Sequence, residues 1–146
     1  MGGRNIMINT KIHKAVYGLA ETMMEADRKG HKGDFDSLYA QLQAICVDNE
    51  KTDKDHPEQW ETLADFTEEL EVALGLYEKA LGKARERNAK DYLSSIAFSM
   101  ANLQMEAGQD DAAIKSLKDA KVSANKIEDK ELKADIDALL ERLLNR

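Results

Sequence analysis

The chain has 146 residues and a formal net charge of −7; 42% of its residues are hydrophobic and 34% are charged. This length suits one domain with a single core, and the negative charge argues against nucleic acid or an anionic membrane as the main partner. Helix-forming residues are plentiful, aromatic residues make up only 5%, and the single proline is Pro57, so the composition predicts an all-α protein.

The N-terminal region carries no long apolar segment, so the sequence predicts neither a signal peptide nor a transmembrane helix and favours a cytoplasmic location. Residues 1–8 are expected to be disordered, and residues 9–146 to form one domain. Cys46 is the only cysteine, which excludes an intrachain disulfide. Its apolar neighbours predict a buried thiol, which is consistent with a reducing compartment.

Two helices are expected at the start of the chain. Apolar residues at helical spacing predict a first helix over 10–29, ended by Gly30, and a second helix over 34–49. A polar loop over 48–56 should follow, with His56 exposed to solvent. Pro57 should then occupy the first turn of a third helix, where its missing N–H is tolerated.

The third helix is either short or continues into a fourth helix that carries the apolar residues from Leu70 to Ala84. The remaining expected helices span 91–107, 111–127 and 130–144. Ten acidic and only two basic residues lie between Val47 and Glu71. This excess predicts either an acidic surface that faces a partner or a surface that only keeps the protein soluble.

The even-numbered expected helices share an apolar pattern with spacings of four and then three residues, which places three side chains on one helical face. The three sets are Leu38, Leu42 and Ile45; Ala73, Tyr77 and Ala80; and Ala113, Leu117 and Ala120. The odd-numbered helices share a large apolar residue followed by alanine, at Leu19-Ala20, Leu63-Ala64 and Met100-Ala101. The small alanine side chain should let the two helices of a hairpin approach closely.

These patterns resemble the tetratricopeptide repeat. Residues 60–64, Trp-Glu-Thr-Leu-Ala, are similar to the start of the family's helix A, and residues 73–80 are similar to its helix B pattern. The spacing from Ala101 to Ala113 is the family's usual one, whereas the first hairpin is longer and the second is shorter.

The resemblance implies a right-handed superhelical array of three antiparallel helix hairpins with a C-terminal capping helix. The hairpins would span 9–49, 57–89 and 90–128, and the capping helix 130–146. A generic helical bundle is the alternative.

No pattern indicates catalysis. The three histidines, His13, His31 and His56, are far apart and lack metal-binding spacing, so all three are expected to lie at the surface. The segment 53–55 begins like a calcium loop but lacks the required glycine and downstream glutamate. We therefore expect no enzymatic activity, no cofactor and no metal.

In tetratricopeptide arrays the helix A residues line a concave groove, and the resemblance carries this role to matching positions here. The implied partner-binding residues are Tyr17, Glu21, Met24, Glu58, Glu61, Asp65, Phe98, Asn102, Met105 and Glu106. Such a groove would be acidic with apolar spots, so the expected partner is a basic or amphipathic protein segment. Met24 and Phe98 could instead belong to the core.

The leading functional prediction is a protein–protein interaction module, an adaptor or scaffold. A chaperone for a secreted protein is a second candidate, because small, acidic, three-repeat chaperones of bacterial secretion systems are similar in size and charge. The sequence is also compatible with a ligand-sensing regulatory protein and with a homodimerisation module that uses helix 10–29 or helix 130–144.

Overall fold

The computed structural model describes residues 9–146, which form seven α-helices and no β-strand. The helices are α1 (Thr10–Arg28), α2 (Lys32–Asp48), α3 (Pro57–Asp65), α4 (Leu70–Glu86), α5 (Lys90–Glu106), α6 (Asp110–Ala124) and α7 (Lys130–Leu144). The predicted all-α fold class is confirmed. The disorder predicted for residues 1–8 concerns a segment outside the described residues. None of these seven helices is long and apolar enough to cross a membrane.

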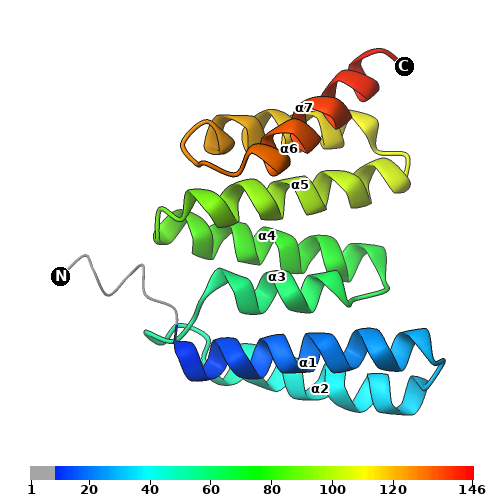
Figure 1. Cartoon of the computed structure of the whole chain (residues 1–146), viewed down its shortest axis with the longest axis vertical. Coiled ribbons are helices and arrows are strands. Elements are labelled where there is room, and N and C mark those ends of the chain that lie inside the picture. The colour runs from blue at the N-terminus through cyan, green and yellow to red at the C-terminus, as the bar shows by residue number, and fades with distance from the viewer. Residues whose placement is uncertain (1–8) are drawn as a thin grey trace.

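Consecutive helices pack as three hairpins, α1–α2, α3–α4 and α5–α6, which stack along the long axis of the molecule (Figure 1). Neighbouring hairpins meet where α2 contacts α3 and where α4 contacts α5. The last helix, α7, packs on α6 and also touches α5, so it covers the end of the stack. The predicted array of three hairpins and a C-terminal helix is therefore confirmed.

The third and fourth helices are separate, a point that the sequence left open. α3 ends at Asp65, and a short link joins it to α4. The Thr67 hydroxyl donates to the carbonyl oxygen of Leu63 at 2.7 Å, and the Tyr77 hydroxyl of α4 donates to Asp65 Oδ1 at 2.6 Å. The short α3 accounts for the reduced repeat spacing that the sequence shows in this hairpin.

The helix ends follow the turn chemistry of the sequence. The side chains of Asn9 and Asp129 accept backbone N–H groups of the first turns of α1 and α7. Gly30 and Gly108 have φ angles of 72° and 78°, which glycine adopts without strain, and each lies in the turn of a hairpin. α6 ends at Ala124, three residues before the predicted end.

The core combines large apolar side chains with buried alanines. Its largest fully buried apolar side chains include Met23, Leu42, Leu63, Ile96, Leu117 and Ile136. Ala64 and Ala101, predicted to allow close packing, are buried, whereas Ala20 is only half-buried. The predicted burial of Cys46 is confirmed, and burial raises the pKa of its thiol to about 12. The thiol is thus neutral and fills space in the core.

The segment between α2 and α3 is the predicted polar loop, but Asp55 and His56 at its end are only 7% and 5% exposed. The Asp55 carboxylate accepts hydrogen bonds from the Trp60 indole and the Lys51 backbone N–H, both at 2.8 Å. It also pairs with the Lys83 ammonium of α4 at 2.6 Å. The predicted solvent exposure of His56 is wrong, and Asp55 is buried beside it, because both residues find partners on neighbouring helices.

His56 is the N-cap residue of α3. Its Nδ1 atom accepts the backbone N–H of Glu58 at 3.1 Å, and its ring packs edge-on against Tyr92 of α5 with 4.9 Å between ring centroids. Burial, together with the positive charge of Arg87, lowers the pKa of His56 to about 4. The imidazole is therefore neutral at pH 7, as an acceptor nitrogen at this position requires.

Candidate partner-binding surface

The odd-numbered helices share one side of the stack, where α1 contacts α3, α3 contacts α5 and α5 contacts α7 (Figure 1). The even-numbered helices lie behind them. We use the name odd-helix face for the solvent-reached side chains of α1, α3, α5 and α7 on this side of the stack. All the predicted partner-binding residues belong to α1, α3 and α5.

On α1, Tyr17 and Met24 are large apolar side chains that reach solvent, with 59% and 57% of their surface exposed. Glu21 lies about one helical turn from each and is also exposed. His13, one turn before Tyr17, contacts Glu58 of α3 through its Nδ1 atom at 2.7 Å. This contact shows which side of α1 faces α3, and Met24 is not a core residue.

The acidic residues predicted on α3 are largely engaged in contacts between helices. Glu58 is held by His13, as described above. Glu61 Oε2 accepts the Ser95 hydroxyl of α5 at 2.7 Å, and Asp65 Oδ1 accepts the Tyr77 hydroxyl of α4 at 2.6 Å. These carboxylates therefore help to hold neighbouring helices together as well as giving the odd-helix face its acidic character.

Burial is the main cause of a raised pKa at two of these carboxyl groups. At Glu61, burial raises the pKa more than the hydrogen bond from Ser95 lowers it. The nearby negative charges of Asp65 and Glu58 raise it further, and the pKa of Glu61 reaches about 7. Burial also raises the pKa of Asp65 against the hydrogen bond from Tyr77, although solvent still reaches this side chain. Because the pKa of Glu61 is about 7, this side chain carries only part of a negative charge at pH 7.

Replacing Glu61 with glutamine should stabilise the chain above pH 7 and change it little near pH 4. Folding raises the pKa of Glu61 from 4.5 to about 7, so the wild type loses stability as the pH rises through this range. Glutamine is neutral and can still accept the Ser95 hydroxyl. The gain at pH 8 should be on the order of 2 kcal/mol in urea unfolding. The exposed control Glu21→Gln should give no such gain, and an equal gain in both variants would refute the assignment to Glu61.

Phe98 and Asn102 of α5 line a hollow of about 240 Å³ between α5 and α7. Phe98 is half-buried, and the amide nitrogen of Asn102 donates to the carbonyl oxygen of Phe98 at 3.0 Å. The α7 side chains that complete the hollow are Asp135, Ala138, Leu139 and Arg142. From the sequence, α7 was predicted to cap the array or to mediate dimerisation, and not to line a hollow with α5. The signal that was missed is the spacing of Asp135, Ala138 and Arg142, which marks a second face beside the leucine-rich one.

The last two predicted residues take no part in these contacts. Met105 is half-buried against the core, and Glu106 is exposed at the C-terminal end of α5. Within residues 9–146, no hydrogen bond or ion pair joins Glu106 to another predicted residue. The structure thus connects the predicted residues of α1, α3 and α5 through His13 and Ser95, two residues absent from the predicted set.

Two solved structures resemble the whole chain. PcrH in complex with the chaperone-binding region of PopD superposes with a TM-score of 0.61 at 23% sequence identity, and the match covers 95% of this chain and 96% of PcrH. PcrH from Pseudomonas aeruginosa gives a TM-score of 0.57 at 20% identity, with coverage of 94% and 96%. No protein-family model and no curated protein matches the sequence. The likeness to PcrH extends over nearly all of both chains, and it supports a tetratricopeptide-like fold of stacked helix hairpins.

Proposed function

We propose that this chain is a non-catalytic interaction module that binds a segment of a partner protein on the odd-helix face. The observation that carries this proposal is the exposure of Tyr17 and Met24 on the side of α1 that faces α3. Side chains of these two types supply adaptable apolar contacts in protein interfaces. The hollow between α5 and α7 extends the same face and offers Phe98 as a third apolar contact.

The chemistry of the face favours a basic or amphipathic segment. Glu21 lies between Tyr17 and Met24 along α1, and Asp65 is reached by solvent on α3. An apolar side chain of the partner would cover Tyr17 or Met24 while a lysine or arginine met these carboxylates. No cofactor enters this proposal, since binding a peptide segment needs none.

A chaperone role is the second candidate, including the role of a chaperone for a secreted protein. It is favoured by the complex in which PcrH, a structural neighbour over the whole chain, holds the chaperone-binding region of PopD. A chaperone and an adaptor differ in what happens to the partner. If the chain is a chaperone, the partner should become unstable or aggregate in cells that lack it, whereas an adaptor's partner should stay folded.

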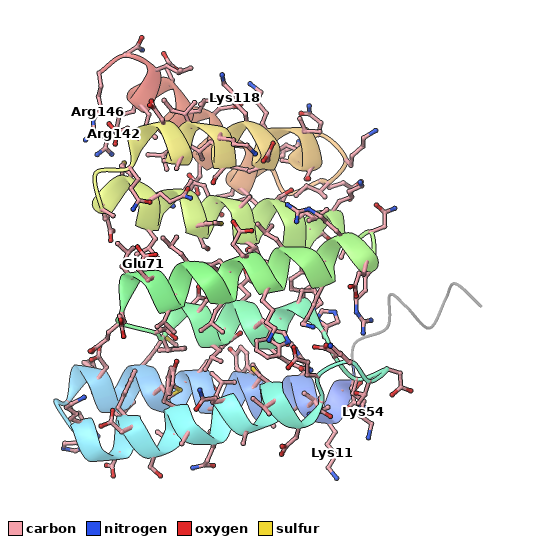
Figure 2. All side chains as sticks on the ribbon, turned by 180° about the vertical axis from the view of Figure 1, so that it is seen from behind. Lys11, Lys54, Glu71, Lys118, Arg142 and Arg146 are labelled. Atoms are coloured by element: carbon pink, nitrogen blue, oxygen red, sulfur yellow. The ribbon has the colours of Figure 1, made fainter. Side chains whose placement is uncertain are left out.

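The proposal is tested by capture from native lysate with the wild type and Glu21→Lys, followed by mass spectrometry. Glu21 is the residue chosen for charge reversal, because replacing Glu61 or Asp65 would also remove a hydrogen bond between helices. Charge reversal should reduce recovery of the partner about 3–10-fold at low salt. The matched control is Glu71→Lys on the opposite side of the molecule, where Glu71 is exposed (Figure 2). Equal recovery with both variants would contradict a basic partner on this face.

A further inference from the structure

The even-numbered helices carry a second recess, on the side of the molecule seen in Figure 2. It has a volume of about 570 Å³ and lies between α4 and α6, with α5 as its floor. Leu93, Ala97 and Met100 form the apolar floor, and Leu81 of α4 and Val122 of α6 stand at the sides. We call this recess the α4–α6 groove. None of its lining residues belongs to the predicted odd-helix set.

The groove is open because nothing bridges its two walls. No pair of Cα atoms from α4 and α6 lies within 8 Å, and no hydrogen bond or ion pair joins these two helices in the described part of the chain. The segment between α2 and α3 is joined to α4 differently. There Lys79 of α4 pairs with Glu50 at 2.7 Å, and Lys83 pairs with Asp55 at 2.6 Å. Ion pairs thus connect α4 to this segment, whereas no such pair connects α4 to α6 within residues 9–146.

Two features of the groove lining suit a bound partner. Val122 is 67% exposed, the largest exposed fraction among the large apolar side chains of residues 9–146. Gln104 is only 7% exposed, and its Oε1 atom accepts the Ser116 hydroxyl at 2.7 Å. Within residues 9–146, the amide nitrogen of Gln104 has no hydrogen-bond partner. Among these residues, Gln59 Oε1 is the only fully buried side-chain polar atom without a partner. The Gln104 nitrogen is therefore reached by solvent and can donate to a ligand.

The dimensions of the groove fit a row of side chains. Its α6 wall runs from Ala112 to Ser123, which at 1.5 Å per residue is roughly 16 Å, or three helical turns. A partner helix of about three turns would lie along the two walls and insert one apolar stripe between them.

A helix fits this surface better than an extended segment does. The backbone groups of α4, α5 and α6 are already used within their own helices, and the groove floor on α5 is apolar apart from Gln104. An extended peptide would leave most of its own N–H and C=O groups without partners against that floor. A helix satisfies its backbone internally and presents only side chains.

The charged residues around the groove define the polarity of the partner. Lys115 lies in the first half of α6, and Arg85 lies near the C-terminal end of α4, so positive charge marks the two ends. Glu78 and Asp119 lie between them. Asp119 pairs with Lys115 at 3.3 Å, but the two side chains are 62% and 81% exposed, so each can still meet a charge of a partner. We propose that the α4–α6 groove binds an amphipathic helix of another protein whose apolar stripe is flanked by acidic residues at both ends and basic residues in the middle.

The proposal is tested with a synthetic helical peptide of about 18 residues. It carries a leucine stripe, glutamates near both ends and lysines in the middle; the matched control has the same stripe with glutamates and lysines exchanged. Backbone amide shifts of the ¹⁵N-labelled full chain report where each peptide binds. The designed peptide should shift amides around Leu93, Ala97 and Met100, and the control should bind about 10-fold more weakly.

Three variants sharpen the test. Val122→Asp should weaken the designed peptide about 10-fold or more, whereas Val47→Asp, at a 57% exposed valine on α2, should leave its affinity unchanged. Arg85→Glu should weaken the designed peptide and strengthen the charge-exchanged one. These sites are exposed, so unchanged amide spectra away from the substitution show that the fold is intact.

Equal affinity for both peptides, or shifts confined to the odd-helix face, would overturn the proposal. So would concentration-dependent self-association in sedimentation that Val122→Asp abolishes, since that result would assign the groove to a second copy of this chain. Because the groove and the odd-helix face share no residue in these tests, failure of this inference leaves the proposed function standing.

Discussion

Replacing Asp55 with alanine should lower the free energy of unfolding by about 3 kcal/mol. The Asp55 carboxylate is buried and bonded to the Lys83 ammonium, the Trp60 indole and the backbone N–H of Lys51. Alanine would leave these three donors without their acceptor, and the Lys83 side chain is only 13% exposed. The Lys83 ammonium also lies 5.3 Å from the centroid of the Trp60 ring of α3. The ion pair with Asp55 helps to hold the ammonium in this position.

Urea unfolding of Asp55→Ala beside Asp53→Ala measures this effect. Asp53 precedes Asp55 by two residues in the same segment but is exposed, so its replacement should change stability by less than about 0.5 kcal/mol. The variant Asp55→Asn keeps the shape of the side chain but loses the charge, and should fall between the two. Equal stability of Asp55→Ala and Asp53→Ala would show that the buried contacts contribute nothing.

The contribution of Asp55 should also depend on pH. Burial opposes ionisation of this carboxyl group, but the hydrogen bonds from Lys83, Lys51 and Trp60 outweigh it and lower its pKa below 3.8. A lowered pKa in the folded state means that the stabilisation is present above about pH 4 and is lost as the pH falls further.

The sequence was sufficient to predict the helices and their stacking, because both depend on local patterns. Apolar spacing, the glycine at position 30 and the proline at position 57 set most helix boundaries to within a few residues. The burial of Asp55 and His56 could not be predicted in the same way. Their partners Lys83 and Tyr92 lie 28 and 36 residues further along the chain, and polar residues in a loop give no sign of which distant helix will cover them.

The residues of the odd-helix face could likewise be predicted only in part. The tetratricopeptide resemblance indicated the helices that form the odd-helix face, and Tyr17, Glu21 and Met24 are exposed there. The pairing of the α3 carboxylates could not be read from the sequence, since Glu58 meets a residue 45 positions away and Glu61 meets one 34 positions away. The hollow that α7 lines with α5 was not predicted either, because the leucine-rich stripe of α7 indicated a cap or a dimer contact and its second face is polar.

The double replacement of Tyr17 and Met24 with alanine should cost about 10–100-fold in affinity for the partner segment. Both side chains are more than half exposed, so their loss removes contact area for a partner while leaving the core intact. The expected change in the free energy of unfolding is below about 1 kcal/mol. A large loss of binding without a loss of stability would separate a binding role from a structural one.

The most direct test of the interaction module is the dissociation constant of the captured partner segment, measured by calorimetry for three proteins. These are the wild type, the double variant Tyr17→Ala with Met24→Ala, and the control Val72→Ala, whose valine is 45% exposed on α4. The odd-helix face predicts a loss of about 10–100-fold for the double variant and less than about 2-fold for the control. Wild-type affinity in the double variant would contradict partner binding at this face.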